Sequence, residues 1–163
     1  DSTGKIPTIK HALLYYEKLN KKKYDFILDL DVTSPLRTIE DLLIAVKEFR
    51  ENGEAYNIFS VNKANRNPYF NVVEKNKNGF YSLVKKGSFL SRQSAPSVFD
   101  MNASFYFYKR IYFDKKINSS ISSKSLVYVM PHICFDLDNP FDFDYMDYLL
   151  KNNKLDFEIW KHL

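Results

Sequence analysis

The feature that most constrains the fold is an alternation of strand and helix patterns early in the chain. An apolar run typical of a buried strand covers residues 24–30, "YDFILDL". A helical pattern follows over residues 38–53, and Thr38 and Asp41 have the spacing of a capping box at its start. Residues 56–61, "YNIFSV", indicate a second buried strand. Two strands joined by a helix within one sheet run parallel with a right-handed crossover, so the sequence predicts an α/β fold.

The rest of the chain continues this alternation. Apolar residues recur at helical spacing from Ile9 to Leu19, and Pro7 is well placed near the start of that helix. Three further patterns follow: a strand and then a short turn or helix over 103–113, a strand over 125–130, and a strand end that leads into a helix over 134–153. We find no internal repeat in these patterns.

The middle of the chain has a different pattern. Residues 69–84 alternate between polar and apolar around Asn78-Gly79, which is a strong signal for a β-hairpin. Residues 85–100 are polar and typical of a loop, and they contain Pro96. We therefore expect this region to be an insertion into the α/β sheet.

Composition excludes several classes of protein. The chain has 163 residues and 45% hydrophobic content, enough for one domain with a core, and no apolar run reaches the length of a transmembrane span. The single cysteine, Cys134, excludes an internal disulfide framework and fits a reducing compartment. The net charge of +4 is modest, and no block of lysine and arginine is dense enough for nucleic acid. We expect a cytoplasmic protein that binds neither membranes nor nucleic acid.

A polar loop, "DVTSPLRT", follows the first predicted strand directly. In open parallel sheets, ligands bind beyond the carboxyl ends of the strands, where this loop lies. Thr33 and Ser34 can form hydrogen bonds, Pro35 stiffens the loop, and Arg37 is a fixed cation suited to carboxylate or phosphate. The residues also allow a purely structural interpretation, with a turn, a helix cap and a surface charge, and the pattern alone leaves both open.

A second polar stretch, "FDLDNPFD", covers residues 135–142. Asp136 and Asp138 are two positions apart, so their side chains point the same way in an extended segment. Two such carboxylates suit Mg²⁺, especially a Mg²⁺ shared with a polyphosphate. Asp142 could cap the following helix. The alternative is that the first two acids are ordinary residues at a strand end.

Several segments in this order resemble one family. They are "DSTGKIPTIKHAL", more weakly, and then "DVTSPLRT", "SRQSAPSVFDMNASFYFY" and "FDLDNPFDF". Their order and spacing resemble those of the acylneuraminate cytidylyltransferases, also called CMP-sialic acid synthetases, across nearly the whole chain. The agreement in order is far more specific than any one motif.

The resemblance implies a fold and a reaction. The fold is a nucleotide-diphosphosugar-transferase-like (Rossmann-like) α/β domain in three layers, with a mainly parallel sheet. Residues 1–163 would form a single domain, incomplete at its N-terminal end, in which residues 66–100 are an inserted hairpin arm that packs on a second protomer. The family joins CMP from CTP to a nine-carbon, sialic-type sugar acid and releases pyrophosphate, for surface glycan synthesis. A cytoplasmic homodimer is implied.

The resemblance also implies the roles of particular residues. Asp136 and Asp138 would be the catalytic carboxylates that bind Mg²⁺. The residues implied at the substrate site are Asp31, Thr33, Ser34, Arg37, Arg92, Gln93, Asn102 and Tyr106. Arg92 matches an arginine associated with the acidic sugar, and Thr33 and Ser34 would shape the loop.

The chain departs from the family pattern in three places. Asp31 stands where the family has glutamine, and an aspartate beside an anionic sugar repels it unless a cation or a proton intervenes. Ala103 stands where the family has a glycine, which disfavours a positive φ if one is required there. The family's N-terminal strand and triphosphate-binding loop have no counterpart in these residues, so we expect this chain alone to bind CTP poorly.

Two alternatives to this enzyme remain open from the sequence. One is a truncated or degenerate homologue that dimerises through the hairpin arm without chemistry. The other is a related nucleotidyltransferase that uses a different sugar acid, such as a 3-deoxy-octulosonate.

Overall fold

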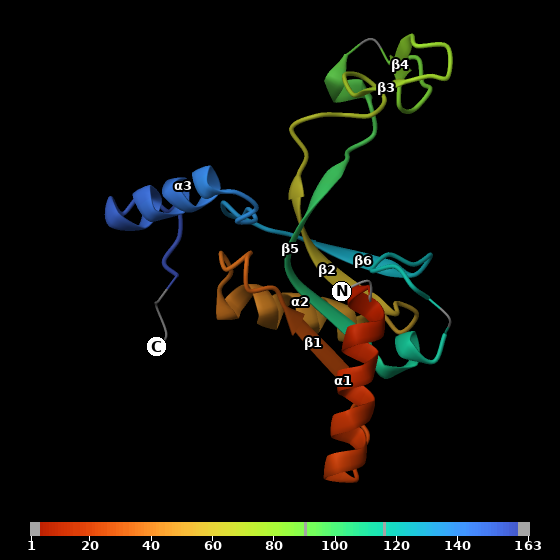
Figure 1. Ribbon diagram of the computed structural model, residues 1–163, viewed down its shortest axis with the longest axis vertical. Coiled ribbons are helices and arrows are strands. Elements are labelled where there is room, and N and C mark those ends of the chain that lie inside the picture. Colours follow the sequence, from red (N-terminus) through yellow and green to blue (C-terminus); the bar gives the residue numbers. More distant parts are fainter. Residues whose placement is uncertain (1–3, 90, 116, 160–163) are drawn as a thin grey trace. The chain divides into compact units, whose positions relative to one another are not determined.

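A computed structural model describes residues 4–89, 91–115 and 117–159, except that the side chain of Arg92 lies outside the described part (Figure 1). The chain divides into two compact units. The first comprises Asp1–Val61 and Asn102–Leu163, and the second comprises Asn62–Met101. The predicted hairpin lies in the second unit.

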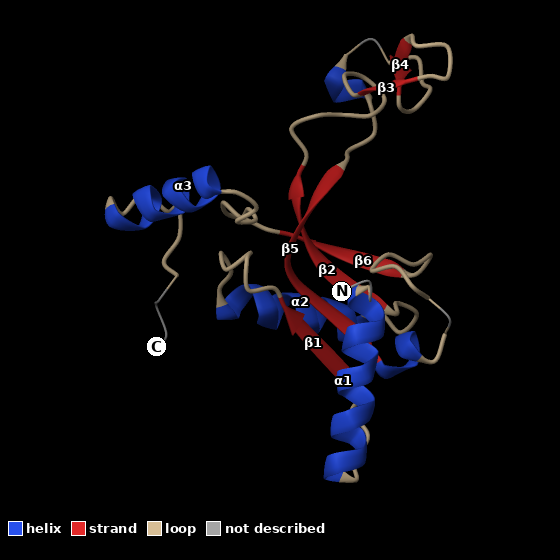
Figure 2. Ribbon diagram, in the orientation of Figure 1, coloured by secondary structure: helices blue, strands red, loops and turns tan. Residues whose placement is uncertain are grey.

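A mixed four-stranded sheet forms the centre of the first unit (Figure 2). The strand order is β1-β5-β2-β6, in which β1 pairs antiparallel with β5 and β2 pairs parallel with β6. The strands are β1 (Phe26–Leu30), β2 (Asn57–Lys63), β5 (Phe99–Lys109) and β6 (Ser125–Val129).

The expectation of a mainly parallel sheet is wrong. The Lys109 N–H donates to the Tyr56 carbonyl oxygen at 2.9 Å, and the Ala64 N–H donates to the Val98 carbonyl oxygen at 3.1 Å, so β5 and β2 run in opposite directions. The chain leaves β2, passes through the second unit and returns as β5 between β1 and β2. An apolar run indicates a buried strand but not its direction, and for this reason the periodicity did not reveal the inserted antiparallel strand.

Helices cover both faces of the sheet. On one face, Ala45 and Phe49 of α2 (Ile39–Glu51) pack with Phe105 and Phe107 of β5. On the other face, Leu13 of α1 (Lys5–Asn20) packs in a cluster with the alternate residues of β5, Tyr106 and Tyr108. Because successive side chains of a strand point to opposite faces, β5 contributes to both cores, and the first unit has three layers.

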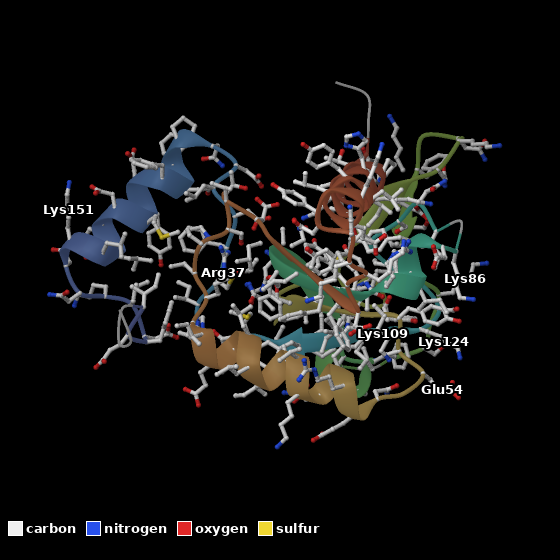
Figure 3. All side chains as sticks on the ribbon, turned by 90° about the horizontal axis from the view of Figure 1, so that it is seen from below. Arg37, Glu54, Lys86, Lys109, Lys124 and Lys151 are labelled. Carbon is white, nitrogen blue, oxygen red and sulfur yellow. The ribbon has the colours of Figure 1, made fainter. Side chains whose placement is uncertain are left out.

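The helix boundaries follow the predicted local signals. Thr38 and Asp41 form the capping box of α2, and Asn139 and Asp142 form one at the start of α3 (Pro140–Lys151). The prediction that Asp142 caps this helix is confirmed. Lys109, at the end of β5, donates from its ammonium to the Asn52 carbonyl oxygen at 2.9 Å, which satisfies the end of α2 (Figure 3).

The second unit contains the predicted β-hairpin. β3 (Val73–Lys75) pairs antiparallel with β4 (Tyr81–Leu83). Gly79 has a φ of 87°, which glycine adopts without strain, so the hairpin signal at this position is confirmed. Whether this hairpin is a dimerisation arm stays a prediction.

Two short 3₁₀ helices complete the described elements: η1 (Arg92–Ser94) in the second unit and η2 (Arg110–Phe113) after β5. The second of these is the short turn or helix that the sequence predicts after this strand. Among the described residues, no helix combines the length and apolar character needed to cross a bilayer.

Candidate functional site

The polar loop after β1 lies beside the acidic segment that precedes α3. The Leu137 N–H donates to the Thr33 carbonyl oxygen at 2.8 Å, and the Asp31 N–H donates to the Ser104 carbonyl oxygen at 3.3 Å. Three segments that are far apart in the sequence therefore meet: the loop after β1, the middle of β5 and the segment that carries Asp136.

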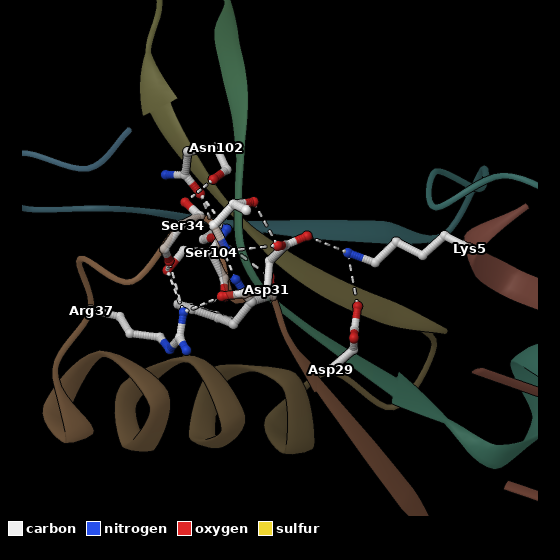
Figure 4. A network of polar contacts seen from close by, with 10 residues as sticks. Lys5, Asp29, Asp31, Ser34, Arg37, Asn102 and Ser104 are labelled. Atoms are coloured by element: carbon white, nitrogen blue, oxygen red, sulfur yellow. Dashed lines mark hydrogen bonds and ion pairs between the residues drawn. The ribbon is translucent and has the colours of Figure 1, made fainter. Parts of the chain in front are cut away.

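Ser34 and Arg37 hold the loop in shape (Figure 4). Ser34 is fully buried, and its hydroxyl donates to the Asn102 carbonyl oxygen. Nη1 of Arg37 donates to the carbonyl oxygens of Ser34 at 2.8 Å, Ser104 at 3.0 Å and Asp31 at 3.1 Å. The predicted structural role of Ser34 fits these bonds, and at least one nitrogen of Arg37 binds the backbone rather than a ligand.

Asn102 is buried and directed into the protein. Its side-chain oxygen accepts hydrogen bonds from the Ser60 hydroxyl at 2.6 Å and from the Ser104 N–H at 3.2 Å. The next residue, Ala103, has a φ of 55°. The positive φ that glycine would favour is therefore present here, and an alanine adopts it.

Lys5 supplies the cation that Asp31 requires. Its ammonium lies 3.4 Å from Oδ2 of Asp31 and 2.9 Å from Oδ2 of Asp29 (Figure 4). The same ammonium lies 4.1 Å from the centre of the Tyr106 ring. Oδ1 of Asp31 accepts hydrogen bonds from the N–H and the hydroxyl of Thr33. Burial raises the pKa of Asp31, but the bonds from Thr33 and the charge of Lys5 outweigh it, so that pKa is lowered.

Sequence reasoning missed Lys5. It is a single lysine in the first turn of α1, without a motif around it, and Asp31 is 26 residues away. Burial lowers the pKa of Lys5, and the bond and charge of Asp29 together with the charge of Asp31 outweigh this effect. The ammonium beside Asp29 and Asp31 is therefore charged.

Asp136 has an unsatisfied oxygen. Its Oδ1 is buried and accepts no hydrogen bond from the residues that the structure describes. Burial raises the pKa of Asp136; the Ser34 hydroxyl acts against this, and the negative charges of Asp138 and Asp31 reinforce it. A buried oxygen among like charges favours a bound cation, because a cation removes both the missing contact and the repulsion.

Asp138 is exposed, and its N–H donates to Oδ2 of Asp142 at 3.0 Å. The segment from Ile133 to Asp138 is not part of a strand, so the predicted strand end is wrong here. Its polar groups bond the neighbouring loop and the helix cap instead of a sheet. The described residues contain no group of three or more His, Cys, Asp or Glu side chains arranged for a metal ion. Two carboxylates still suit Mg²⁺, which commonly takes its other ligands from water and phosphate.

Two predicted residues belong to the second unit. Gln93 lines a pocket of about 440 Å³ together with Asn67 and Pro96. Nδ2 of Asn67 donates to the Pro96 carbonyl oxygen at 2.9 Å, which fixes one wall. The side chain of Arg92 lies outside the described part of the chain. The first unit holds the other predicted site residues, and their roles toward a substrate stay predictions.

Comparison with known proteins identifies relatives over almost the whole chain. A "Post-translational flagellin modification protein B" from Campylobacter coli is 36% identical over 95% of this chain. A "CMP-N,N'-diacetyllegionaminic acid synthase" from Campylobacter jejuni subsp. jejuni is 38% identical over 95% of this chain. The resemblance to the CMP-sialic acid synthetases is confirmed. The chain spans 65% of the length of each of these relatives, and no family model matches it.

Proposed function

We propose that this chain carries the sugar-acid and magnesium part of a cytidylyltransferase. The reaction joins CMP from CTP to a nonulosonic acid and releases pyrophosphate, and we propose an acid of the diacetyllegionaminic type. The observation that carries the proposal is the buried, unpartnered oxygen of Asp136 beside the Thr33–Arg37 loop, in a homologue of a protein named for this reaction.

Asp136 and Asp138 fit Mg²⁺ through their charge and through the open oxygen of Asp136. When bound there, Mg²⁺ would neutralise the charge of the triphosphate and orient it for in-line displacement. Asp136 is held for this role by its neighbour, because the Leu137 N–H donates to the Thr33 carbonyl oxygen. A carboxylate that is fixed in advance loses little entropy when it binds an ion.

Lys5 and Asp31 would face the anionic sugar acid. Lys5 offsets the negative charges of Asp29 and Asp31, so these two carboxylates repel the anionic sugar acid less strongly. Asp31 offers a carboxylate that accepts hydrogen bonds from hydroxyl or amide N–H groups of the sugar, where the family's glutamine both donates and accepts. Tyr106, whose ring lies under Lys5, forms the floor of this subsite.

The family resemblance also assigns two residues of the second unit to the sugar acid. We propose that Arg92 and Gln93 contact the acid, and that the hairpin of β3 and β4 packs on a second copy of the chain, as the family resemblance implies. Gln93 shares its pocket with Asn67 and Pro96, which are joined by a hydrogen bond. A cytoplasmic homodimer is part of the proposal.

The test measures pyrophosphate release from CTP and Mg²⁺ with a panel of sugar acids. The full-length protein that contains these residues is incubated with diacetyllegionaminic acid, N-acetylneuraminic acid and a 3-deoxy-octulosonate. We expect release with at least one nine-carbon acid and most with the diacetylated acid. Release with the octulosonate alone would assign a different sugar acid, and the absence of release with every acid would contradict the proposed reaction.

A further inference from the structure

His132 lies between α2 and the segment that carries the two candidate metal ligands. Its Nε2 is 2.9 Å from Oδ2 of Asp41, and its Nδ1 is 3.0 Å from the Ile133 carbonyl oxygen. The side chains of His132 and Asp41 are only 7% and 3% exposed. A carboxylate and a carbonyl can only accept hydrogen bonds, so a ring that makes both bonds must donate from both nitrogens, which requires the charged imidazolium.

Both carboxylate oxygens of Asp41 accept hydrogen bonds. Besides His132, its carboxylate accepts hydrogen bonds from the Thr38 N–H at 2.7 Å, the Thr38 hydroxyl at 2.6 Å and the Tyr128 hydroxyl at 3.0 Å. Burial opposes its ionisation, but the bonds from His132 and Thr38 outweigh burial and lower the pKa of Asp41 to about 2. The negative charge that faces His132 is therefore fixed.

The other side of His132 contacts the C-terminal segment. The His132 ring stacks on Phe157 with their centres 3.7 Å apart and their planes at 19°. The neighbouring Ile133 N–H donates to the Asp156 carboxylate at 3.1 Å. His132 and its neighbour Ile133 thus join three parts of the first unit: the start of α2, the segment toward Asp136, and residues 156–157.

We propose that His132 is a positioning residue that, in its charged form, holds the segment of Asp136 and Asp138 against α2, and that loss of its proton releases this segment. The proposal rests on the proposed function for its effect on catalysis. A neutral imidazole has a single N–H, so it must give up either Asp41 or the Ile133 carbonyl oxygen. Loss of the Asp41 bond separates the segment from α2, and loss of the Ile133 bond separates the ring from its own segment, so both weaken the connection four residues before Asp136.

The charged and titratable groups around the ring set the direction of this switch. Burial lowers the pKa of His132, but its bonds to Asp41 and the Ile133 carbonyl, with the charges of Asp41 and Asp156, raise it above the ordinary 6.5. Burial and Asp41 raise the pKa of Tyr128, which therefore keeps its proton. Glu40 and Glu158 line the same cleft of about 720 Å³. The segment is held below the raised pKa of His132 and is released as the pH rises through it.

The first test is a nuclear magnetic resonance titration of the ring protons in the full-length protein. His132 is assigned by its loss in His132→Gln, and its midpoint is compared between the wild type and Asp41→Asn. We expect the wild-type midpoint above 6.5 and a fall of about one pH unit or more in Asp41→Asn. A midpoint unaffected by Asp41→Asn would overturn the proposal, whether or not the protein is an enzyme.

The second test follows the segment itself. The Leu137 amide, which bonds the Thr33 carbonyl, should lose protection from hydrogen exchange above the His132 midpoint, after correction for base-catalysed exchange. In His132→Gln, which does not titrate, protection should be independent of pH. The exposed His11 of α1 serves as control, because His11→Gln should keep the wild-type dependence. Equal pH dependence of this protection in His132→Gln and the wild type would contradict the proposed role of His132.

The third test compares the pH profiles of pyrophosphate release. The wild type and His11→Gln should lose activity on the alkaline side at the His132 midpoint, and His132→Gln should lack this limb. The limb surviving in His132→Gln would overturn the proposal. Absence of release in all proteins would contradict the proposed function, and the two spectroscopic tests would still decide the role of His132.

Discussion

Leu137 donates its backbone N–H to the carbonyl oxygen of Thr33 at 2.8 Å. This bond joins the polar loop after β1 to the acidic segment before α3, and the Ser34 hydroxyl lies 3.5 Å from the Phe135 carbonyl oxygen of the same segment. The two motifs therefore lie together in the fold and are not two separate surface loops. This arrangement places Asp136 among Ser34, Asp31 and Lys5, which set its charge environment.

Removing the cation of the site should weaken sugar-acid binding. In Lys5→Met, Asp29 and Asp31 keep their charges without a counterion, and the incoming anion is repelled. We expect about tenfold weaker binding by calorimetry in the full-length protein, which corresponds to the loss of about 1.4 kcal/mol. The double variant Lys5→Met/Asp31→Gln should recover part of the affinity, because one of the two repelling charges is gone.

The matched control for this prediction is Lys10→Met, which removes an exposed charge from the same helix. It should bind the sugar acid like the wild type. Equal affinities of Lys5→Met and Lys10→Met would show that Lys5 does not act on the substrate.

Relieving the backbone at residue 103 should stabilise the protein. Ala103 has a φ of 55°, a conformation that is unfavourable for a residue with a Cβ by about 1–2 kcal/mol, whereas glycine adopts it freely. The greater entropy of glycine in the unfolded chain offsets part of this gain. We therefore expect Ala103→Gly to raise the free energy of unfolding by only about 0.5–1 kcal/mol in urea denaturation. Ala12→Gly, within α1, should instead destabilise by about 1 kcal/mol. Destabilisation by Ala103→Gly would contradict the strain at this position.

The loss of folding stability at acid pH should depend on Asp41. Its folded pKa of about 2 lies below the ordinary 3.8, so its contribution to stability is present above 3.8 and is lost as the pH falls through about 2. The two values imply a contribution of about 2 kcal/mol. Circular dichroism of the wild type and Asp41→Asn between neutral and acid pH measures it.

In this comparison, Asp41→Asn should be less stable near neutral pH and should converge toward the wild type in acid. Asp144→Asn, which changes an exposed carboxylate of α3, should follow the wild type throughout. A constant difference between Asp41→Asn and the wild type at every pH would rule out the low pKa.

Local signals account for the elements that the sequence predicts well. The boxes at Thr38 and Asn139 and the turn at Gly79 each depend on residues within a few positions of one another. The sheet order was not predictable in this way. The insertion of β5 between β1 and β2 is a pairing of distant strands, and an apolar run does not specify its neighbours or direction.

The site was predictable in part, for the same reason. The loop after β1 and the acidic pair can be seen as motifs, and the loop lies at the end of a strand, where α/β sheets bind ligands. The residues that pair with the charged groups of the first unit could not be predicted from the sequence. Lys5 reaches Asp31 across 26 residues and His132 reaches Asp41 across 91, and neither pair has a motif around it.

The most direct test of the central claim is pyrophosphate release by Asp136→Asn and Asp138→Asn, with Asp144→Asn as a matched control. These changes remove a carboxylate charge and keep the size of the side chain. If the pair holds Mg²⁺ against the triphosphate, both site variants lose at least about a hundredfold in rate, and added Mg²⁺ restores part of it, while Asp144→Asn keeps the wild-type rate. Wild-type release by Asp136→Asn and Asp138→Asn at low Mg²⁺ would contradict the account.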